Sequence, residues 1–497
     1  AFLTSRAFTA ALLAGDVRRA AALAPADPAG DVALYRLGAL VRGVEALAED
    51  DGKRAHAIFV SRGSGVPQEV AASLIAPFAA AAAGDERDAL VHPVIAGDPI
   101  SQFFANLDQG ELYERAHRYD EAETAFRSLI AKGDPGAIPS IKLGEFLERR
   151  GRRADAIAIY GDALGRNPGD GALVVASARA KAGKEPPPLP PIRKSAAEAL
   201  IAPATALILQ KQDQVALAYL RLALRLDPTR DEAWLLVGDI LSNEGDTEGA
   251  RVAYMTPKRG SDQYVAARGK LAWSYHGAKD KEMALKTARE TLAAEPLNQD
   301  AAVNLADLLR ADERYDESAK VLDALIAAKG DQADWRLLYM RAVDFEESGR
   351  WADAERDLRV ALKKRPDEPE LLNFLGYSWI DRGERLPEAM VMVRKAVSLD
   401  PQSGAMLDSL GWGYYRLGDY KAAVENLEAA VVLEPGDPDV NNHLGDAYWR
   451  VGRHTEAQFQ WRRVLTLDPS SKIKAEAEAK LKSGLGGPPP ASLVAAQ

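Results

Sequence analysis

Three stretches near the end of the chain repeat one pattern: Leu-Gly-Tyr-Ser-Trp at 375–379, Leu-Gly-Trp-Gly-Tyr at 410–414 and Leu-Gly-Asp-Ala-Tyr at 444–448. After each stretch come an alanine, a bulky residue four positions later, and a proline. These residues are Ala389, Val393 and Pro401, then Ala423, Leu427 and Pro435, then Ala457, Trp461 and Pro469. A pattern that returns every 34 or 35 residues indicates stacked helical hairpins.

The alanine of this pattern can be followed through nearly the whole chain, with one serine in the series. It falls at Ala20, Ala55, Ala89, Ala122, Ala156, Ala216, Ala250, Ala284, Ser318, Ala354, Ala389, Ala423 and Ala457. The steps are 33 to 36 residues long, except for one of 60 after Ala156. Because two antiparallel helices cannot bury their apolar faces alone, each hairpin needs neighbours. The series therefore predicts an all-α fold, an α/α superhelical solenoid of about thirteen hairpins.

The repeating unit, with Leu-Gly-x2-Tyr, then Ala-x3-bulky, then Pro, is similar to the tetratricopeptide repeat (TPR). Residues 371–467 and the segments 216–228 and 233–238 resemble TPR proteins of alphaproteobacterial type and related outer-membrane lipoproteins. The better understood members of that family are periplasmic adaptors, which bring a carboxyl-terminal-processing protease to peptidoglycan hydrolases. The resemblance implies a non-catalytic scaffold that binds such protein partners. The alternative is a regulatory subunit that activates a partner enzyme by rearranging it.

The same resemblance implies a periplasmic or outer-membrane-associated lipoprotein, and a cytoplasmic location is the alternative. The chain begins at Ala1 inside a helical pattern, which leaves open a signal segment or lipid anchor upstream. Its longest apolar run, 70–83, is too short to cross a bilayer, and we expect it to form a buried helical hairpin. The net charge of −10 argues against nucleic acid as a partner.

Nothing in the sequence indicates catalysis. The chain has no cysteine, which excludes disulfides and thiolate chemistry. Its six histidines are scattered without the spacing of metal ligands, and phosphate-binding and nucleophile motifs are missing. We therefore expect no enzyme activity, no cofactor and no metal.

A proline-rich segment divides the repeats. The run Glu-Pro-Pro-Pro-Leu-Pro-Pro-Ile at 185–192 cannot be helical. It predicts four parts: an N-terminal solenoid segment at 1–183, a linker at 184–193, a C-terminal solenoid with a capping helix at 194–482, and a disordered tail at 483–497. The segment is interpreted as a surface linker, with a docking ligand for an aromatic groove and a hinge as alternatives.

We number each repeat so that the glycine of the pattern (Gly376, Gly411 or Gly445) is position eight. The candidate binding surface is the stripe formed by positions two, five, nine and twelve of each first helix, which line the inner wall of stacked hairpins. In the last three repeats this stripe mixes rings with amides and carboxylates and holds no Lys or Arg. Its predicted partner-binding residues are Glu370, Asn373, Tyr377, Asp408, Trp412, Tyr415, Asn442, Asp446 and Trp449. A basic or amide-rich partner segment fits this composition. Packing of these rings between neighbouring helices is the alternative.

Overall fold

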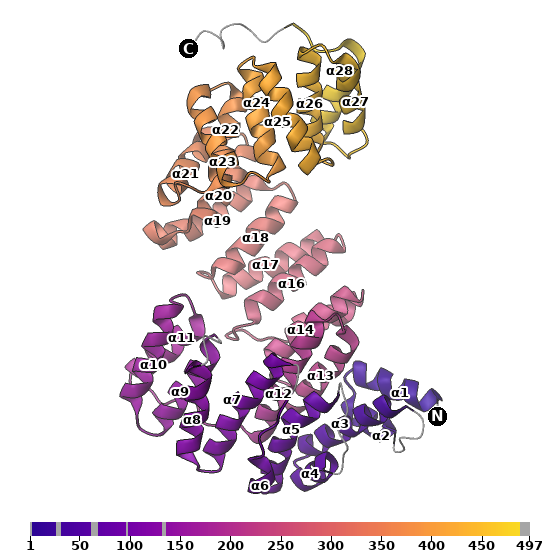
Figure 1. Ribbon diagram of the computed structural model, residues 1–497, viewed down its shortest axis with the longest axis vertical. Coiled ribbons are helices and arrows are strands. Elements are labelled where there is room, and N and C mark those ends of the chain that lie inside the picture. The colour runs from indigo at the N-terminus through magenta and orange to yellow at the C-terminus, as the bar shows by residue number, and fades with distance from the viewer. Residues whose placement is uncertain (1, 26–30, 61–67, 96–97, 132–135, 488–497) are drawn as a thin grey trace. The chain divides into compact units, whose positions relative to one another are not determined.

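The fold is built from helices (Figure 1), in a computed structural model that describes residues 2–25, 31–60, 68–95, 98–131 and 136–487. Within these ranges there are twenty-eight α-helices, one short 3-10 helix and no strand, which confirms the all-α prediction. The chain separates into two compact units, residues 1–278 and 279–497, and each is described by itself. No helix in the described part is both long enough and apolar enough to cross a membrane.

The first unit holds sixteen α-helices. They are α1 (Phe2–Leu13), α2 (Val17–Leu23), α3 (Val32–Ala48), α4 (Gly52–Val60), α5 (Gln68–Ala83), α6 (Glu86–Ala89), α7 (Pro99–Arg115), α8 (Tyr119–Ala131), α9 (Ala137–Arg149), α10 (Arg153–Arg166), α11 (Gly171–Lys181), α12 (Ile192–Leu209), α13 (Asp213–Leu226), α14 (Asp231–Asn243), α15 (Thr247–Tyr254) and α16 (Tyr264–Gly277).

The second unit holds the other twelve and the 3-10 helix. They are α17 (Lys281–Ala294), α18 (Gln299–Ala311), α19 (Tyr315–Lys329), η1 (Gly330–Gln332), α20 (Trp335–Glu347), α21 (Trp351–Lys364), α22 (Pro369–Arg382), α23 (Leu386–Leu399), α24 (Gly404–Arg416), α25 (Tyr420–Leu433), α26 (Pro438–Arg450), α27 (His454–Val464) and α28 (Ser471–Ser483).

Twelve of the thirteen predicted helix pairs each lie within one compact unit, and the thirteenth, α16 with α17, falls on either side of the division between the units. Each of the twelve alanines and Ser318 lies on the second helix of its pair, and all thirteen are buried. The two helices of a pair approach closely because the first helix carries a small residue. In the last pair, a Cβ added to Gly445 would lie 2.5 Å from Trp461 Nε1. Close packing of this kind leaves no space for a larger side chain. The thirteen pairs account for twenty-six of the α-helices, and α11 and α28 stand outside them.

The unpaired helix α11 ends a side branch of the first unit. After it, residues 184–191 form no helix, and the chain returns to helices that precede the branch. Helix α12 packs against α5 and α7, and α13 packs against α3 and α1. Figure 1 shows α8–α11 on one side of α7 and α12 with α13 on the other. The proline-rich segment therefore lies inside the first compact unit, and the compact units divide at 278/279 rather than at the expected 184–193.

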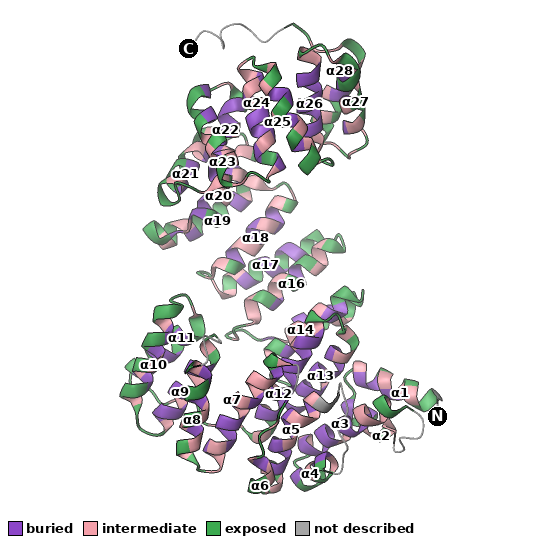
Figure 2. Ribbon diagram, viewed as in Figure 1, coloured by how far each residue is buried: buried purple, intermediate pink, exposed green. Residues whose placement is uncertain are grey.

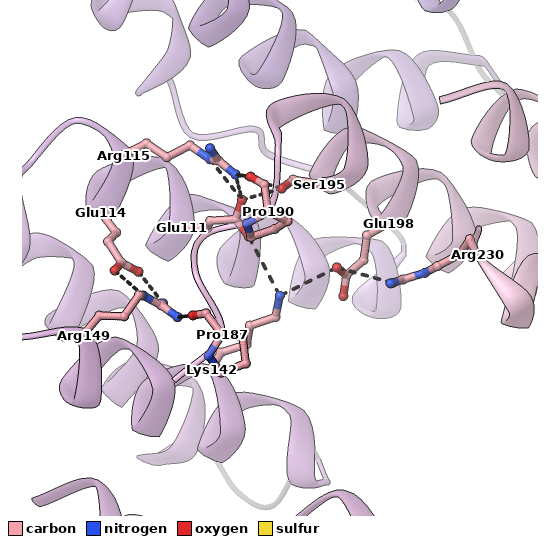
Figure 3. Close-up of polar contacts among 10 residues, drawn as sticks. All are labelled: Glu111, Glu114, Arg115, Lys142, Arg149, Pro187, Pro190, Ser195, Glu198 and Arg230. Carbon is pink, nitrogen blue, oxygen red and sulfur yellow. Dashed lines mark hydrogen bonds and ion pairs between the residues drawn. The ribbon is translucent and has the colours of Figure 1, made fainter. Parts of the chain in front are cut away.

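Side chains from the branch and from α7 hold this returning segment, which we name the proline-rich strap (residues 184–191). Arg115 on α7 donates to the carbonyl oxygen of Pro190, and Arg149 on α9 donates to that of Pro187, at 3.0 Å. Figure 3 shows both arginines paired with glutamates of α7, Arg115 with Glu111 and Arg149 with Glu114. Arg153 also donates to the carbonyl oxygen of Lys184, at 3.4 Å. Because its main chain is bound by three arginines, the strap is a structural part of the first unit.

The apolar run at 70–83 corrects one expectation. It forms a single helix, α5, and not a hairpin. Pro77 stands inside that helix, where a proline removes one hydrogen bond and costs about 3 kcal/mol. Leu74, Ile75 and Phe78 are at most 1% exposed, so burial offsets this cost. Figure 2 shows buried residues along α5, α12 and α13.

The end of the chain follows the prediction in part. The expected capping helix is α28, which packs against α27 and α26. Residues 484–487 form no helix, and Arg450 donates to the carbonyl oxygens of Gly486 and Gly487. The rest of the predicted disordered tail, 488–497, lies outside the described residues.

Candidate partner-binding groove

The first helices of four successive pairs form one wall in the second unit, which we name the helix-A wall (α20, α22, α24 and α26). Helix α24 packs against both α22 and α26, and the rings of Tyr339 on α20 and Phe374 on α22 are 5.6 Å apart. A cavity of about 580 Å³ opens on this wall. We name it the acidic groove, because seven carboxylates line it: Glu368, Glu370, Asp400, Asp408, Glu434, Asp437 and Asp439.

These carboxylates have unusual surroundings for this chain. Of the described residues that line the groove, none is Lys, Arg or His. The sole ion pair that any of the seven makes within the described part of the chain joins Asp408 to His443. Elsewhere on the same unit, carboxylates such as Asp357 and Glu346 are met by arginines. The groove therefore concentrates negative charge that the chain itself leaves largely unpaired.

Local structure fixes some of these carboxylates and leaves others free to bind. Asp437 is the N-cap of α26 and accepts from the backbone N–H groups of residues 439 and 440. Glu434 accepts from the backbone N–H of Ala405 at 3.1 Å. Partial desolvation by the groove walls raises the pKa of Asp439, although the residue is exposed, with His443 opposing the shift and neighbouring carboxylates adding to it. A cation placed beside Asp439 would lower the pKa of this carboxyl again.

The structure separates the nine predicted partner-binding residues into two groups. Glu370, Asn373, Tyr377 and Asp408 line the acidic groove. The other five are not among its lining residues: Trp412, Tyr415, Asn442, Asp446 and Trp449. Tyr415, Asn442 and Asp446 are at most 5% exposed, because neighbouring helices cover them. Contact of any of the nine with a partner stays a prediction.

Trp412 belongs to a stack of rings and not to the open groove. Its ring lies between Tyr415, at 4.6 Å between centroids, and His443, at 4.1 Å. Nδ1 of His443 lies 3.0 Å from each carboxylate oxygen of Asp408. Sequence reasoning missed His443, because it stands at position six, beside the stripe. The signal that was available was its spacing of 35 residues from Asp408, one repeat along the chain.

The capping helix covers the last repeat in a similar way. Lys480 on α28 lies 2.9 Å from Asn442 Oδ1 and 2.8 Å from Asp446 Oδ1. Trp449 stacks on His454 at 4.2 Å between centroids. A Cβ added to Gly484 would lie 2.1 Å from the Trp449 ring, so the residue after α28 packs directly on it. These three predicted binding residues are therefore occupied by the chain's own end.

The pair of His443 and Asp408 should make the stability of the second unit depend on pH. Burial alone lowers the pKa of His443, but Asp408 and the other nearby carboxylates together raise it more, so the net shift is upward. Asp439 and Asp446 also favour the protonated ring. A group whose pKa is higher in the folded state than in the unfolded state stabilises the fold. This stabilisation is complete below the unfolded pKa of about 6.5, and it is lost as pH rises through the folded pKa.

We therefore expect the melting temperature of the second unit to fall as pH rises from about 6 to about 9. In the His443→Gln variant this decline should disappear. Thermal unfolding can be followed by tryptophan fluorescence, since six of the eight tryptophans lie in this unit. An equal decline in the variant and the wild type would contradict the assignment to His443.

Comparison with known proteins identifies the repeats. Profiles of the tetratricopeptide repeat match residues 107–171, 270–333, 339–404 and 438–471, and a TPR repeat profile matches 413–452. A TPR repeat-containing protein of Pseudomonas aeruginosa is 39% identical over 102 residues, which is 20% of this chain and 17% of the relative. This chain thus spans less than a fifth of that curated relative's length.

Solved structures with a similar fold include two proteins at 14% identity. One is a tetratricopeptide repeat protein from Parabacteroides merdae, with a TM-score of 0.43, covering 51% of this chain and 97% of that chain. The other is the Cut9–Hcn1 hetero-tetramer of the APC/C, with a TM-score of 0.41, covering 97% and 95%. The chain described here is a tetratricopeptide-repeat protein. Proteins of this class generally serve as scaffolds for protein–protein interaction.

Proposed function

We propose that this chain is a scaffold that holds a basic segment of a partner protein in its acidic groove. The observation that carries the proposal is the set of seven groove carboxylates, with no Lys, Arg or His among the described lining residues. Carboxylates gathered in one hollow raise the local concentration of cations and speed their association. Lysines and arginines of a partner would complete the charge pairing that the chain does not supply.

The side chains best suited to meet a partner are those that no group of the chain already holds. Glu370 and Asp439 are exposed, and Glu368 is half-buried. None of the three side chains makes an ion pair with a described residue of the chain, and Glu368 makes no capping hydrogen bond. Substituting them removes charge from the groove without breaking a cap or a buried pair.

The test uses the synthetic peptide Ser-Lys-Ile-Lys-Ala-Glu-Ala-Glu-Ala-Lys-Leu-Lys-Ser, which copies residues 471–483, and a version with all four lysines replaced by glutamine. The lysine peptide should bind the full chain and the glutamine peptide should not. The triple variant E368Q/E370Q/D439N should bind the lysine peptide at least about tenfold more weakly, because each partly exposed ion pair contributes about 0.5–1 kcal/mol. Fluorescence anisotropy at two salt concentrations measures both effects.

The control is a triple variant with the same change of net charge outside the groove. Glu384, Glu425 and Glu478 are exposed and do not line it. E384Q/E425Q/E478Q should bind the lysine peptide as tightly as the wild type. Equal weakening by both triple variants would reduce the effect to net charge and would reject the groove as the site.

We further propose that the protein works in the cell envelope, with a carboxyl-terminal-processing protease and peptidoglycan hydrolases as its partners. The support for this proposal is the resemblance of residues 371–467 to periplasmic adaptors. Pull-down from a periplasmic extract with the wild type and with E368Q/E370Q/D439N tests it. Recovery of such a protease by the wild type alone would support the proposal, and its absence from both samples would reject it.

A further inference from the structure

The helix-A wall places one polar pair, from positions five and nine, on each of three successive helices. The pairs are Asn373 with Tyr377 on α22, Asp408 with Trp412 on α24, and Asn442 with Asp446 on α26. Since the helices are equivalent by the repeat, the pairs occupy equivalent places on the wall. The side chains that contact the three pairs can therefore be compared directly.

Two of the three pairs are met by a cationic side chain from the second helix further along the chain. Lys480 of α28 meets the α26 pair, with Nζ at 2.9 Å from Asn442 Oδ1 and from Asp446 Oδ2. His443 of α26 meets the α24 pair through Asp408 and through its stack on Trp412. In both cases the nitrogen comes from about one repeat further along the chain.

The third pair has no such group within hydrogen-bond distance in the described part of the chain: His443 reaches only the ring of Tyr377, at 6.5 Å between centroids, and Asn373 Oδ1 has no donor. On α24, Ser409 occupies position six, where α26 has His443, and its hydroxyl donates to the Ala405 carbonyl oxygen. The Oδ1 atom of Asn373 is buried, and no donor in the described part of the chain lies within hydrogen-bond distance. A buried acceptor without a donor costs about 1–3 kcal/mol. Asn373 and Tyr377 both line the acidic groove, so a ligand bound there would lie beside them.

We infer that Asn373 and Tyr377 receive one lysine side chain of the partner, as Asn442 and Asp446 receive Lys480. The inference rests on the proposed function and adds to it the place in the acidic groove where one lysine binds. An ammonium group has three donors, which suits the Asn373 carbonyl and the carboxylates around it. The aromatic ring of Tyr377 provides an apolar and electron-rich surface for the lysine stem and head. The occupant is a lysine-bearing helix, because the chain's own example, Lys480, stands on one.

The test uses the same 13-residue peptide and four versions, each with one lysine replaced by norleucine. One of the four replacements should weaken binding to the full chain by about tenfold, and the other three by less. Asn373→Leu should weaken binding of the parent peptide by about tenfold and abolish the difference made by that one norleucine. Asn373→Asp should strengthen binding of the parent peptide, because it adds a carboxylate.

The two substitutions have opposite expected signs, so a loss of folding cannot imitate the result. If the lysine peptide binds and E368Q/E370Q/D439N weakens it, but both Asn373 variants bind like the wild type, the lysine position is wrong and the proposed function stands. If the lysine peptide and the glutamine peptide bind equally, or neither binds, both proposals are rejected. Circular dichroism confirms that each variant keeps its helices.

Discussion

Replacing Trp461 with alanine should lower the free energy of unfolding of the second unit by about 3–5 kcal/mol. Trp461 lies on α27, is 0% exposed, and fills the space left by Gly445 on α26. Its Nε1 donates to Asp446 Oδ1 at 3.0 Å. The substitution therefore opens a cavity and removes a hydrogen bond from a buried carboxylate. Denaturant titration followed by helical circular dichroism measures the change.

Phe459 offers a matched control two residues earlier on the same helix. Its side chain is 59% exposed, so Phe459→Ala removes an aromatic ring without opening a cavity. Its effect on the free energy of unfolding should stay within about 0.5 kcal/mol. If both substitutions destabilised the unit to the same extent, helix propensity would account for the effect, and the packing of Trp461 against Gly445 would be refuted.

Replacing Arg115 with alanine should destabilise the first unit by about 3–5 kcal/mol. The guanidinium bridges α7, the proline-rich strap and α12: it pairs with Glu111 at 2.7 Å and donates to the Pro190 carbonyl oxygen and to Ser195 Oγ. Glu111 would be left buried, with Lys142 at 3.8 Å as its remaining cation. Limited proteolysis should then cut within the strap, because its main chain has lost one of its three arginine contacts.

Arg118 provides the comparison for this experiment. It makes an ion pair with Glu121 three residues later, and both side chains are more than 40% exposed. Arg118→Ala removes the same kind of side chain close to Arg115, and it should leave the unfolding midpoint and the protease pattern unchanged. Cleavage of the strap in the Arg118 variant as well would mean that the strap is accessible without the loss of Arg115.

The hairpin register was predictable because it depends on residues within one repeat. The two helices of one pair touch at the alanines of the pattern and at small residues such as Gly376, Gly411 and Gly445. Because the pattern is periodic, the same contact is expected in every repeat. Helix α15 ends at Tyr254, shortly before Pro257, because a proline has no N–H to continue the helical hydrogen bonds. The return of the chain after α11 was not predictable, because it depends on which distant faces are left uncovered.

The repeat pattern indicates which residues line the groove only where no side chain from another helix covers them. Glu370, Asn373 and Tyr377 line the acidic groove as the stripe predicts. Trp449, Asn442 and Asp446 do not, because Lys480 and Gly484 belong to a segment outside the repeats, whose position the period does not give. His443 was missed because a residue beside the stripe on one helix reaches the stripe of the preceding helix.

The return of the chain through the proline-rich strap also has a consequence for synthesis on the ribosome. Glu45 on α3 pairs with Arg225 on α13 at 2.8 Å, across 180 residues of sequence. At about 5–20 residues per second, the ribosome needs roughly 10–40 s to deliver the second partner after the first. During that interval the apolar faces of α3 and α5 have emerged without the helices that later cover them, so nascent chains halted near residue 180 should be the ones that a chaperone binds.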